Sequence, residues 1–153
     1  MPKHATVTFS RNTAGSQGEL IDGGILNTES SPIVLNSILW HNSGPAGGIE
    51  IFNDDASSMP TVSHSIIAGG YAGTGNLNVD PMLNTDLTLR AGSPAIDSGA
   101  CGASVATTDI LGNPRWDIAS VPNAAGSNAV DMGAYEYQGT AGTDGIITNV
   151  ACP

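Results

Sequence analysis

The sequence predicts an all-β solenoid of about three turns, followed by an irregular C-terminal cap. First, "SPIVLNSILWHN" (31–42) aligns with "MPTVSHSIIAGG" (59–70), so that Pro32 lies over Pro60 and Ile38 over Ile66. Second, "VTFSRN" (7–12) lies over "SILWHN" (37–42) at a similar spacing. Third, 20 Gly and nine Pro leave little room for long helices. A period near 28 with short β-rich pieces is typical of solenoids, whereas an ordinary β-sandwich would need chance similarity.

In a solenoid, each strand pairs in parallel with its copies above and below, so like residues stack in columns. Phe9, Leu39 and Ile67 form an apolar column that we expect inside the core. Asn36 and His64 share a tight bend, where left-handed backbone angles are needed. A second polar column is expected at Asn12, Asn42 and Gly70.

The chain divides by pattern into a repeated part, a cap and a tail. Residues 1–80 contain the turns, which we expect over 5–27, 28–55 and 56–80. Each predicted chain reversal contains Gly, as such reversals need. The last residues, 139–153, look like a linker with no core of their own.

Residues 81–138 do not repeat, and they are expected to form the cap. The last turn of a solenoid exposes backbone groups and an open core end, which an irregular terminal unit must cover. Trp116, Tyr135 and Tyr137 are the expected bulk of this cap.

The second half carries motifs that resemble a known family. The combination of "DPML", "DLTLRAGSPAIDSG", "DILGNPR" and "VDMGAYEYQG" resembles the choice-of-anchor Q domain, which ends many bacterial right-handed parallel β-helix proteins. The turns "NSILWHNSG" and "SHSIIAGGYAGTGNLNVDPML" are similar to the repeats that precede it, so the resemblance covers roughly residues 5–138. It implies a right-handed parallel β-helix that is exported and placed at the cell surface or outside. It does not imply a defined catalytic activity.

The chain departs from that family in two ways. Many relatives have a cysteine where this chain has Val130, so Cys101 either pairs with Cys152 or stays free. A loop closed by these two cysteines would stabilise the fold by roughly 4 kcal/mol in the chain-entropy model. Relatives also have more turns and a signal peptide, which indicates a chain truncated at its N-terminus.

Composition excludes some partners. The formal net charge is −10, and the fixed cations are Lys3, Arg11, Arg90 and Arg115. Too few cations are present to neutralise phosphates, so nucleic acid and anionic membranes are not expected partners. No apolar stretch reaches the roughly 18 residues of a membrane span. An excess of Ser, Thr, Asn and Gly with little Lys is common in exported proteins, which agrees with an extracellular or cell-surface location.

Parallel β-helices include pectin-degrading enzymes, so the sequence must be weighed for catalysis. The polygalacturonase-like "NTD" (84–86) and "DD" (54–55) occur in reversed order, without the accompanying His and basic motifs. Lyase chemistry would have to use one of the three arginines as its base. We therefore predict a non-catalytic scaffold or adhesive surface. The alternative is a carbohydrate-active module, either a polysaccharide binder or the remnant of a lyase or hydrolase.

Two sets of residues are candidate sites. Trp40 beside His41 could stack on a sugar face, or Trp40 could pack under a loop. Asp97, Asp109 and Asp131 each lie near Gly and could ligate Ca²⁺, although short Asp side chains also satisfy turn amides. No other cofactor is expected.

The first turn is a candidate for self-association. An uncovered edge near Val7 and Phe9 would present unpaired backbone groups to a second copy. We therefore expect contact through residues 5–30, with the cap remote from it.

Overall fold

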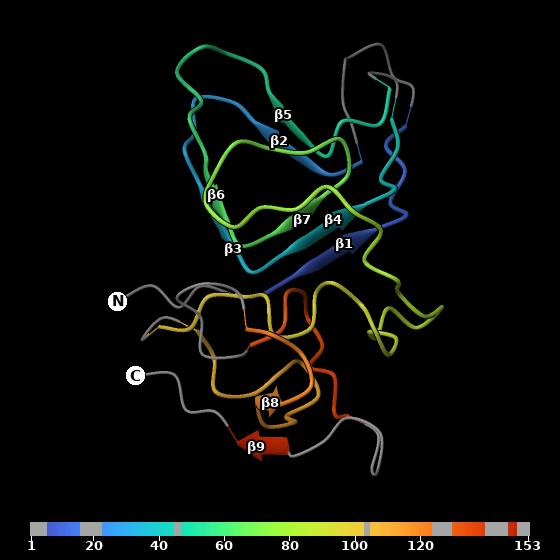
Figure 1. Ribbon diagram of the computed structural model, residues 1–153. Helices are drawn as coiled ribbons and strands as arrows, with labels where there is room; N and C mark the ends of the chain where they lie inside the picture. The colour runs from blue at the N-terminus through green and yellow to red at the C-terminus, as the bar shows by residue number, and fades with distance from the viewer. Residues whose placement is uncertain are drawn as a thin grey trace.

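The computed structural model describes residues 6–15, 23–44, 47–102, 105–123 and 130–139, together with the backbone of 147–149. Over these residues the protein is all-β, with nine short strands and no helix (Figure 1). Most strands are three residues long and are joined by bends that frequently contain Gly or Asn.

The central sheet confirms the predicted apolar column. β1 (Thr8–Ser10), β4 (Ile38–Trp40) and β7 (Ile66–Ile67) pair in parallel in the order β1-β4-β7. Phe9 lies opposite Leu39, and Leu39 lies opposite Ile67. The two alignments expected from the sequence are therefore the observed registers.

Two further parallel pairs repeat this arrangement. β2 (Ile25–Asn27) pairs with β5 (Ile51–Asn53), and β3 (Ile33–Leu35) pairs with β6 (Thr61–Ser63). The Gly-rich segments before β2 and β5 thus lead into equivalent strands. All three sheets contribute to one apolar cluster, whose members are Phe9, Ile25, Val34, Leu39, Ile51, Val62, Ile67 and Tyr71.

Polar side chains also stack between neighbouring strands. The Asn12 amide donates to Asn42 Oδ1 at 2.9 Å, as the predicted polar column requires. The Asn27 amide donates to Asn53 Oδ1 at 2.9 Å in the same way. Such ladders satisfy amides that would otherwise be left unpaired at the bends.

The bends repeat as well. Asn36 and His64 have φ angles of 49° and 45°, which confirms the left-handed bend expected at this column. Arg11 and His41, which follow β1 and β4, both have φ of 59°. A single left-handed residue turns the chain sharply, so equivalent residues lie at equivalent corners.

The far side of β7 is covered by a short segment of the chain. Leu77 forms a parallel bridge with Ile66, donates its N–H to Ser65 O at 2.8 Å, and accepts from Ile67 N at 2.9 Å. Tyr71 packs against the core cluster from the same segment. Residues 71–77 therefore add a shortened rung beyond β7.

The second half of the chain lies against the flank of the strand stack, on the outer face of the β1-β4-β7 sheet (Figure 1). Ile38 and Ile66 point to this face and pack with Leu89, Ala95, Ile96, Ile118 and Met132. Sequence reasoning placed residues 81–138 over the end of the stack; the structure places them on its side. The reason is that the sheet is apolar on both faces, so its outer face needs a cover.

Close backbone approach fixes this flank contact. Ala134 N donates to Thr8 Oγ1 at 3.0 Å, and Gly133 N donates to Asn36 O at 2.8 Å. Gly133 has φ of 98°, and a Cβ there would come within 2.8 Å of Ile38 Cδ1 and Thr8 Oγ1. Glycine is required at this position for both reasons.

Aliphatic residues, rather than the expected aromatic ones, fill most of the second half. Trp116 and Tyr137 are only partly buried against the cluster, and Tyr135 is half-exposed. β8 (Trp116–Ile118) pairs antiparallel with β9 (Ile147–Asn149). The expectation of a plain linker over 139–153 is thus wrong at 147–149, where β-branched residues favour a strand. Among the described residues there is no helix long and apolar enough to cross a membrane.

Candidate ligand-binding groove

A small groove lies between the bends that follow β1 and β4 and the segment 80–90. Its volume is about 130 Å³. It is lined by Ser10, Arg11, Trp40, His41, Asp80, Pro81, Met82, Leu83 and Arg90. The groove thus contains both predicted carbohydrate contacts and two of the three candidate lyase cations.

Trp40 and His41 form the aromatic part of the groove. Trp40 ends β4 and is half-buried against the cluster on the outer face of the sheet. Its ring centroid lies 5.3 Å from that of His41, with a tilt of 37° between the planes. Trp40 therefore does pack against neighbouring residues, and it also lines an open groove.

Arg11 and His41 occupy the same corner on neighbouring strands. Both are exposed, and Arg11 N donates to Trp40 O at 3.4 Å. Arg11 follows β1 and His41 follows the paired strand β4. The two side chains therefore leave the backbone about one strand spacing apart, roughly 4.8 Å.

The opposite wall is held by its own turn. Asp80 Oδ1 accepts from Met82 N at 2.8 Å, and Arg90 N donates to Met82 O at 3.2 Å. An antiparallel bridge joins Leu83 to Leu89 beside them. These contacts bring Arg90 to the groove from a segment distant in sequence from Arg11.

The arginines have different surroundings. Arg115 is fully buried and pairs with Glu136, Nη1 to Oε2, at 2.7 Å. Arg11 and Arg90 are exposed, and within the described residues neither side chain has an ion-pair partner. The structure therefore brings two of the three arginines together and separates the third.

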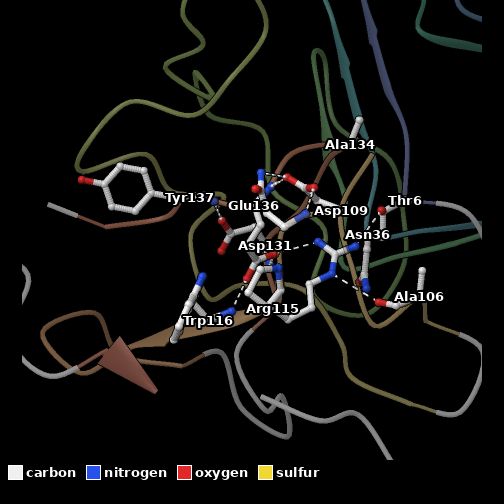
Figure 2. A network of polar contacts seen from close by, with 12 residues as sticks. Thr6, Asn36, Ala106, Asp109, Arg115, Trp116, Asp131, Ala134, Glu136 and Tyr137 are labelled. Atoms are coloured by element: carbon white, nitrogen blue, oxygen red, sulfur yellow. Dashed lines mark hydrogen bonds and ion pairs between the residues drawn. The ribbon is translucent and has the colours of Figure 1, made fainter. Parts of the chain in front are cut away.

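Arg115 belongs to a buried polar network (Figure 2). Its Nη2 donates to Thr6 Oγ1 at 3.1 Å and its Nε to Ala106 O at 3.3 Å. Glu136 also accepts from Trp116 N at 2.9 Å. Burial raises the pKa of Glu136, while the hydrogen bond and charge of Arg115 oppose that shift. The network links the second half of the chain to the residues before β1.

The three aspartates proposed as Ca²⁺ ligands accept hydrogen bonds from backbone N–H groups of this region. Asp131 accepts from Asp97 N at 2.8 Å and from Tyr137 N at 2.6 Å. Asp97 accepts from Ile118 N at 3.1 Å. Asp109 accepts from several amides of its own turn and from Glu136 N at 3.1 Å. No group of three or more metal-ligating side chains is found in the described part of the chain.

Their pKa values differ accordingly. Burial raises the pKa of Asp97 to about 7 despite the bond from Ile118 N, and nearby Asp117 and Glu136 add to the shift. Burial and the charge of Glu136 raise the pKa of Asp131. Burial also opposes ionisation of Asp109, yet its hydrogen bonds keep the pKa of that carboxyl below its ordinary value. These are the features of turn-forming and structural carboxylates.

The residues of the "DD" and "NTD" motifs also form turns. Asp55 accepts from Ser57 and Ser58 and from Glu29 N, which lowers its pKa. Asp86 accepts from Thr88 N at 3.1 Å and from the Thr88 hydroxyl at 2.6 Å, and these bonds lower its pKa. Both motifs therefore have a local structural explanation.

Cys101 is disulfide-bonded in the structure. Cys152 lies outside the described residues, so its pairing with Cys101 stays a prediction. Comparison with models of known protein families, with curated proteins and with solved structures gave no significant match. The resemblance to a choice-of-anchor Q domain thus depends on the sequence motifs alone.

Sequence reasoning identified part of the groove and missed its far wall. The sequence does not predict that Asp80 and Met82 lie near Trp40, and it places Arg90 in the cap. Leu83 and Leu89 are the one sequence signal for this wall. Two apolar residues on either side of a turn indicate a tight chain reversal next to a buried surface, and the structure joins them by an antiparallel bridge.

Proposed function

We propose that the chain is a right-handed parallel β-helix of about three turns. Parallel pairings of similar sequence spacing support this, as in Ile25↔Ile51, Val34↔Val62 and Phe9↔Leu39. So does the shared core to which all three sheets contribute. The right hand is what the motif resemblance implies.

The proposed function is that of a non-catalytic scaffold in an exported or cell-surface protein, which presents an adhesive surface. The observation that carries this proposal is the use of the buried ionisable groups. Asp97, Asp109, Asp131 and Glu136 all accept backbone N–H groups, and Arg115 is paired with Glu136. Asp97 Oδ1 has no hydrogen-bond partner among the described residues, but Asp97 is fully buried. Buried groups held in this way position the chain, whereas a general acid or base must reach a substrate.

A second candidate is a polysaccharide-binding module, and the groove favours it. An aromatic side chain beside guanidinium groups without ion-pair partners in the described structure is a suitable surface for sugar recognition. Binding at the groove is compatible with the scaffold, because an adhesive surface needs a ligand but no turnover.

Incubation of the chain with pectin, alginate and related uronans tests the non-catalytic proposal. We expect no new reducing ends and no rise in the absorbance of unsaturated uronate. Either signal, if it persists in repurified protein and is lost in Arg11→Gln or Arg90→Gln, would contradict the scaffold and support a lyase or hydrolase.

A further inference from the structure

We propose that the groove binds one anionic sugar residue, with Trp40 as the platform and Arg11 and Arg90 as the partners of its acidic group. The inference builds on the proposed adhesive function and names the ligand class. The shared chemistry is a pyranose ring with a carboxylate or sulfate substituent.

The charge distribution points to an anion. The whole chain has a formal net charge of −10 and contains only four Lys and Arg residues in total. Arg115 is buried in its ion pair with Glu136, and Lys3 lies outside the described residues. The other two cations line one small groove, from segments far apart in sequence. Such a concentration of cations in an acidic protein gives a local site for a negative group.

Both cations of the groove are arginines, and the chemistry of the guanidinium group suits an acidic substituent. Guanidinium groups bind carboxylate and sulfate through two parallel N–H donors, which fixes orientation as well as charge. Arg11 belongs to the bend after β1 and Arg90 to the segment 80–90, and both residues line the groove. We therefore expect an anion bound there to accept from both guanidinium groups.

The apolar part of the groove points to a sugar rather than a bare anion. Trp40 is half-buried, so its position is set by packing, and His41 lies against it. An aromatic ring held this way can stack on the C–H face of a pyranose. The volume of about 130 Å³ is below the roughly 300–1,000 Å³ of pockets that enclose drug-sized ligands. The groove therefore fits one ring of a glycan that continues along the surface.

Asp80 gives the groove a selectivity that can be tested. Its Oδ1 accepts a hydrogen bond from Met82 N, and Asp80 also lines the groove. It can accept from a sugar hydroxyl, but its charge weakens binding of the acidic group. Asp80→Asn keeps an oxygen for Met82 N and removes that charge, so we expect it to strengthen anion binding about two- to fivefold.

The test is a titration followed by the indole N–H resonance of Trp40, with that of Trp116 as the internal reference. The probes are trigalacturonate, a sulfated trisaccharide, the methyl ester of trigalacturonate and inorganic sulfate alone. We expect at least one acidic sugar to bind with a Kd on the order of 1 mM or tighter, and to bind more weakly at high salt. Binding of one acidic sugar alone supports the proposal and identifies the group.

Matched variants locate the site. Arg11→Gln and Arg90→Gln should each weaken binding roughly tenfold, because each loses a charge-assisted contact. Both residues are exposed, so the melting temperature should hardly change. The control is Asp54→Asn, an exposed charge change outside the groove lining, which should bind like the wild type.

Four results would overturn the inference: no binding of either acidic sugar, equal binding of the methyl ester, equal binding of inorganic sulfate, or unchanged affinity in both Arg variants. Reducing ends are measured in the same samples. Turnover there would contradict the non-catalytic proposal, whereas absence of binding without turnover would remove only the ligand assignment.

Discussion

The strand stack and the segment on its flank satisfy their buried backbone groups in different ways. In the stack, each strand donates to and accepts from the next, and bends are completed by amide pairs such as Asn12–Asn42. In residues 80–139 the described pairing is mostly isolated bridges, and buried carboxylates accept the backbone N–H groups instead. The first solution can be repeated along the chain, whereas the second depends on particular side chains.

This difference predicts which changes each region tolerates. The stack depends on apolar shape and should fail when a charge enters its core. The flank, residues 80–139, depends on the Arg115–Glu136 ion pair and on carboxylates that accept backbone N–H groups, so it should fail when one of these side chains is removed. Substitutions in the two regions, with exposed residues of the same type as controls, can therefore separate the two kinds of stabilisation.

The largest effect is expected for Leu39→Asp. Leu39 is fully buried between Phe9 and Ile67, so the change combines lost apolar burial with an unpaired carboxyl. We expect a loss of about 5 kcal/mol or more, comparable with the whole stability of many domains. Leu26→Asp is the control, because Leu26 is 41% exposed on β2. A Leu39→Asp protein that melts within a degree or two of the wild type would contradict the core column.

A smaller but still large effect is expected for Arg115→Ala. The change leaves Glu136 buried without its cation, and breaking a buried pair this way costs about 3–5 kcal/mol. Arg90→Ala is the control, since Arg90 is exposed and should change the unfolding free energy by less than about 0.5 kcal/mol. Denaturant titration measures both. Equal stabilities of the two variants would mean that the network contributes no net stability to the flank.

Much of the stack could be predicted from the sequence because the repeat itself encodes the register. Phe9, Leu39 and Ile67 could be aligned by their spacing, and stacking of like residues then follows from parallel pairing. The shortened rung at Leu77 could not be predicted, since Leu77 follows its partner Ile66 well before a full repeat has passed.

The position of the second half could have been read from a different signal. Consecutive apolar residues, Ile38 with Leu39 and Ile66 with Ile67, are typical of strands covered on both faces, and all four are buried in the structure. The sequence predicts Trp40 and His41 as one part of the groove, because they are adjacent in the chain. It does not predict Arg90 there, because the position of Arg90 depends on how residues 80–139 pack against the strands. Long-range packing of irregular segments carries no periodic signal.

The pH dependence of stability sharpens the comparison, because residues 80–139 hold most of the buried acids. Glu50 in the strand stack is the exception: it accepts from Asn42 N, and burial raises its pKa as well. The pKa of Asp97 is about 7 in the folded protein and about 3.9 in an unfolded chain. The folded state thus binds an extra proton between these values, and that stabilisation is lost as pH rises through about 7. The groups that face Asp97 are Ile118 N, Asp117, Asp131 and Glu136, and the pKa values of Asp131 and Glu136 are also raised.

We therefore expect the melting temperature to rise by about 5 °C when the pH is lowered from about 8 to about 5. The lowered pKa values of Asp86 and Asp109 work in the opposite direction, but only below about pH 4. Asp97→Asn is the matched variant, because Asn tolerates the φ of 53° and can still accept from Ile118 N. It should flatten the profile over this pH range. An unchanged slope in Asp97→Asn would assign the effect to other acids.

The smallest effect concerns the edge of β1. Among the described residues β1 pairs on one side only, with β4. A mostly apolar cavity of about 370 Å³ lies at its start, between Val7 and Ile110, and Ile110 is 69% exposed. The expectation that residues 81–138 are remote from this edge is therefore wrong, because that segment packs against β1 as well. An open strand edge beside apolar surface is a template for a second copy, and contact between two identical edges closes after two molecules.

Light scattering should therefore show weak dimer formation that grows with salt, because the charge of −10 opposes the contact at low salt and less so at high salt. Ile110→Lys should abolish the dimer, whereas Ile33→Lys, the same change at a 58% exposed site on β3, should not. A monomer at high micromolar concentration in both salts would mean that this edge is not an association site. Equal dimerisation of the two variants would place the contact elsewhere on the molecule.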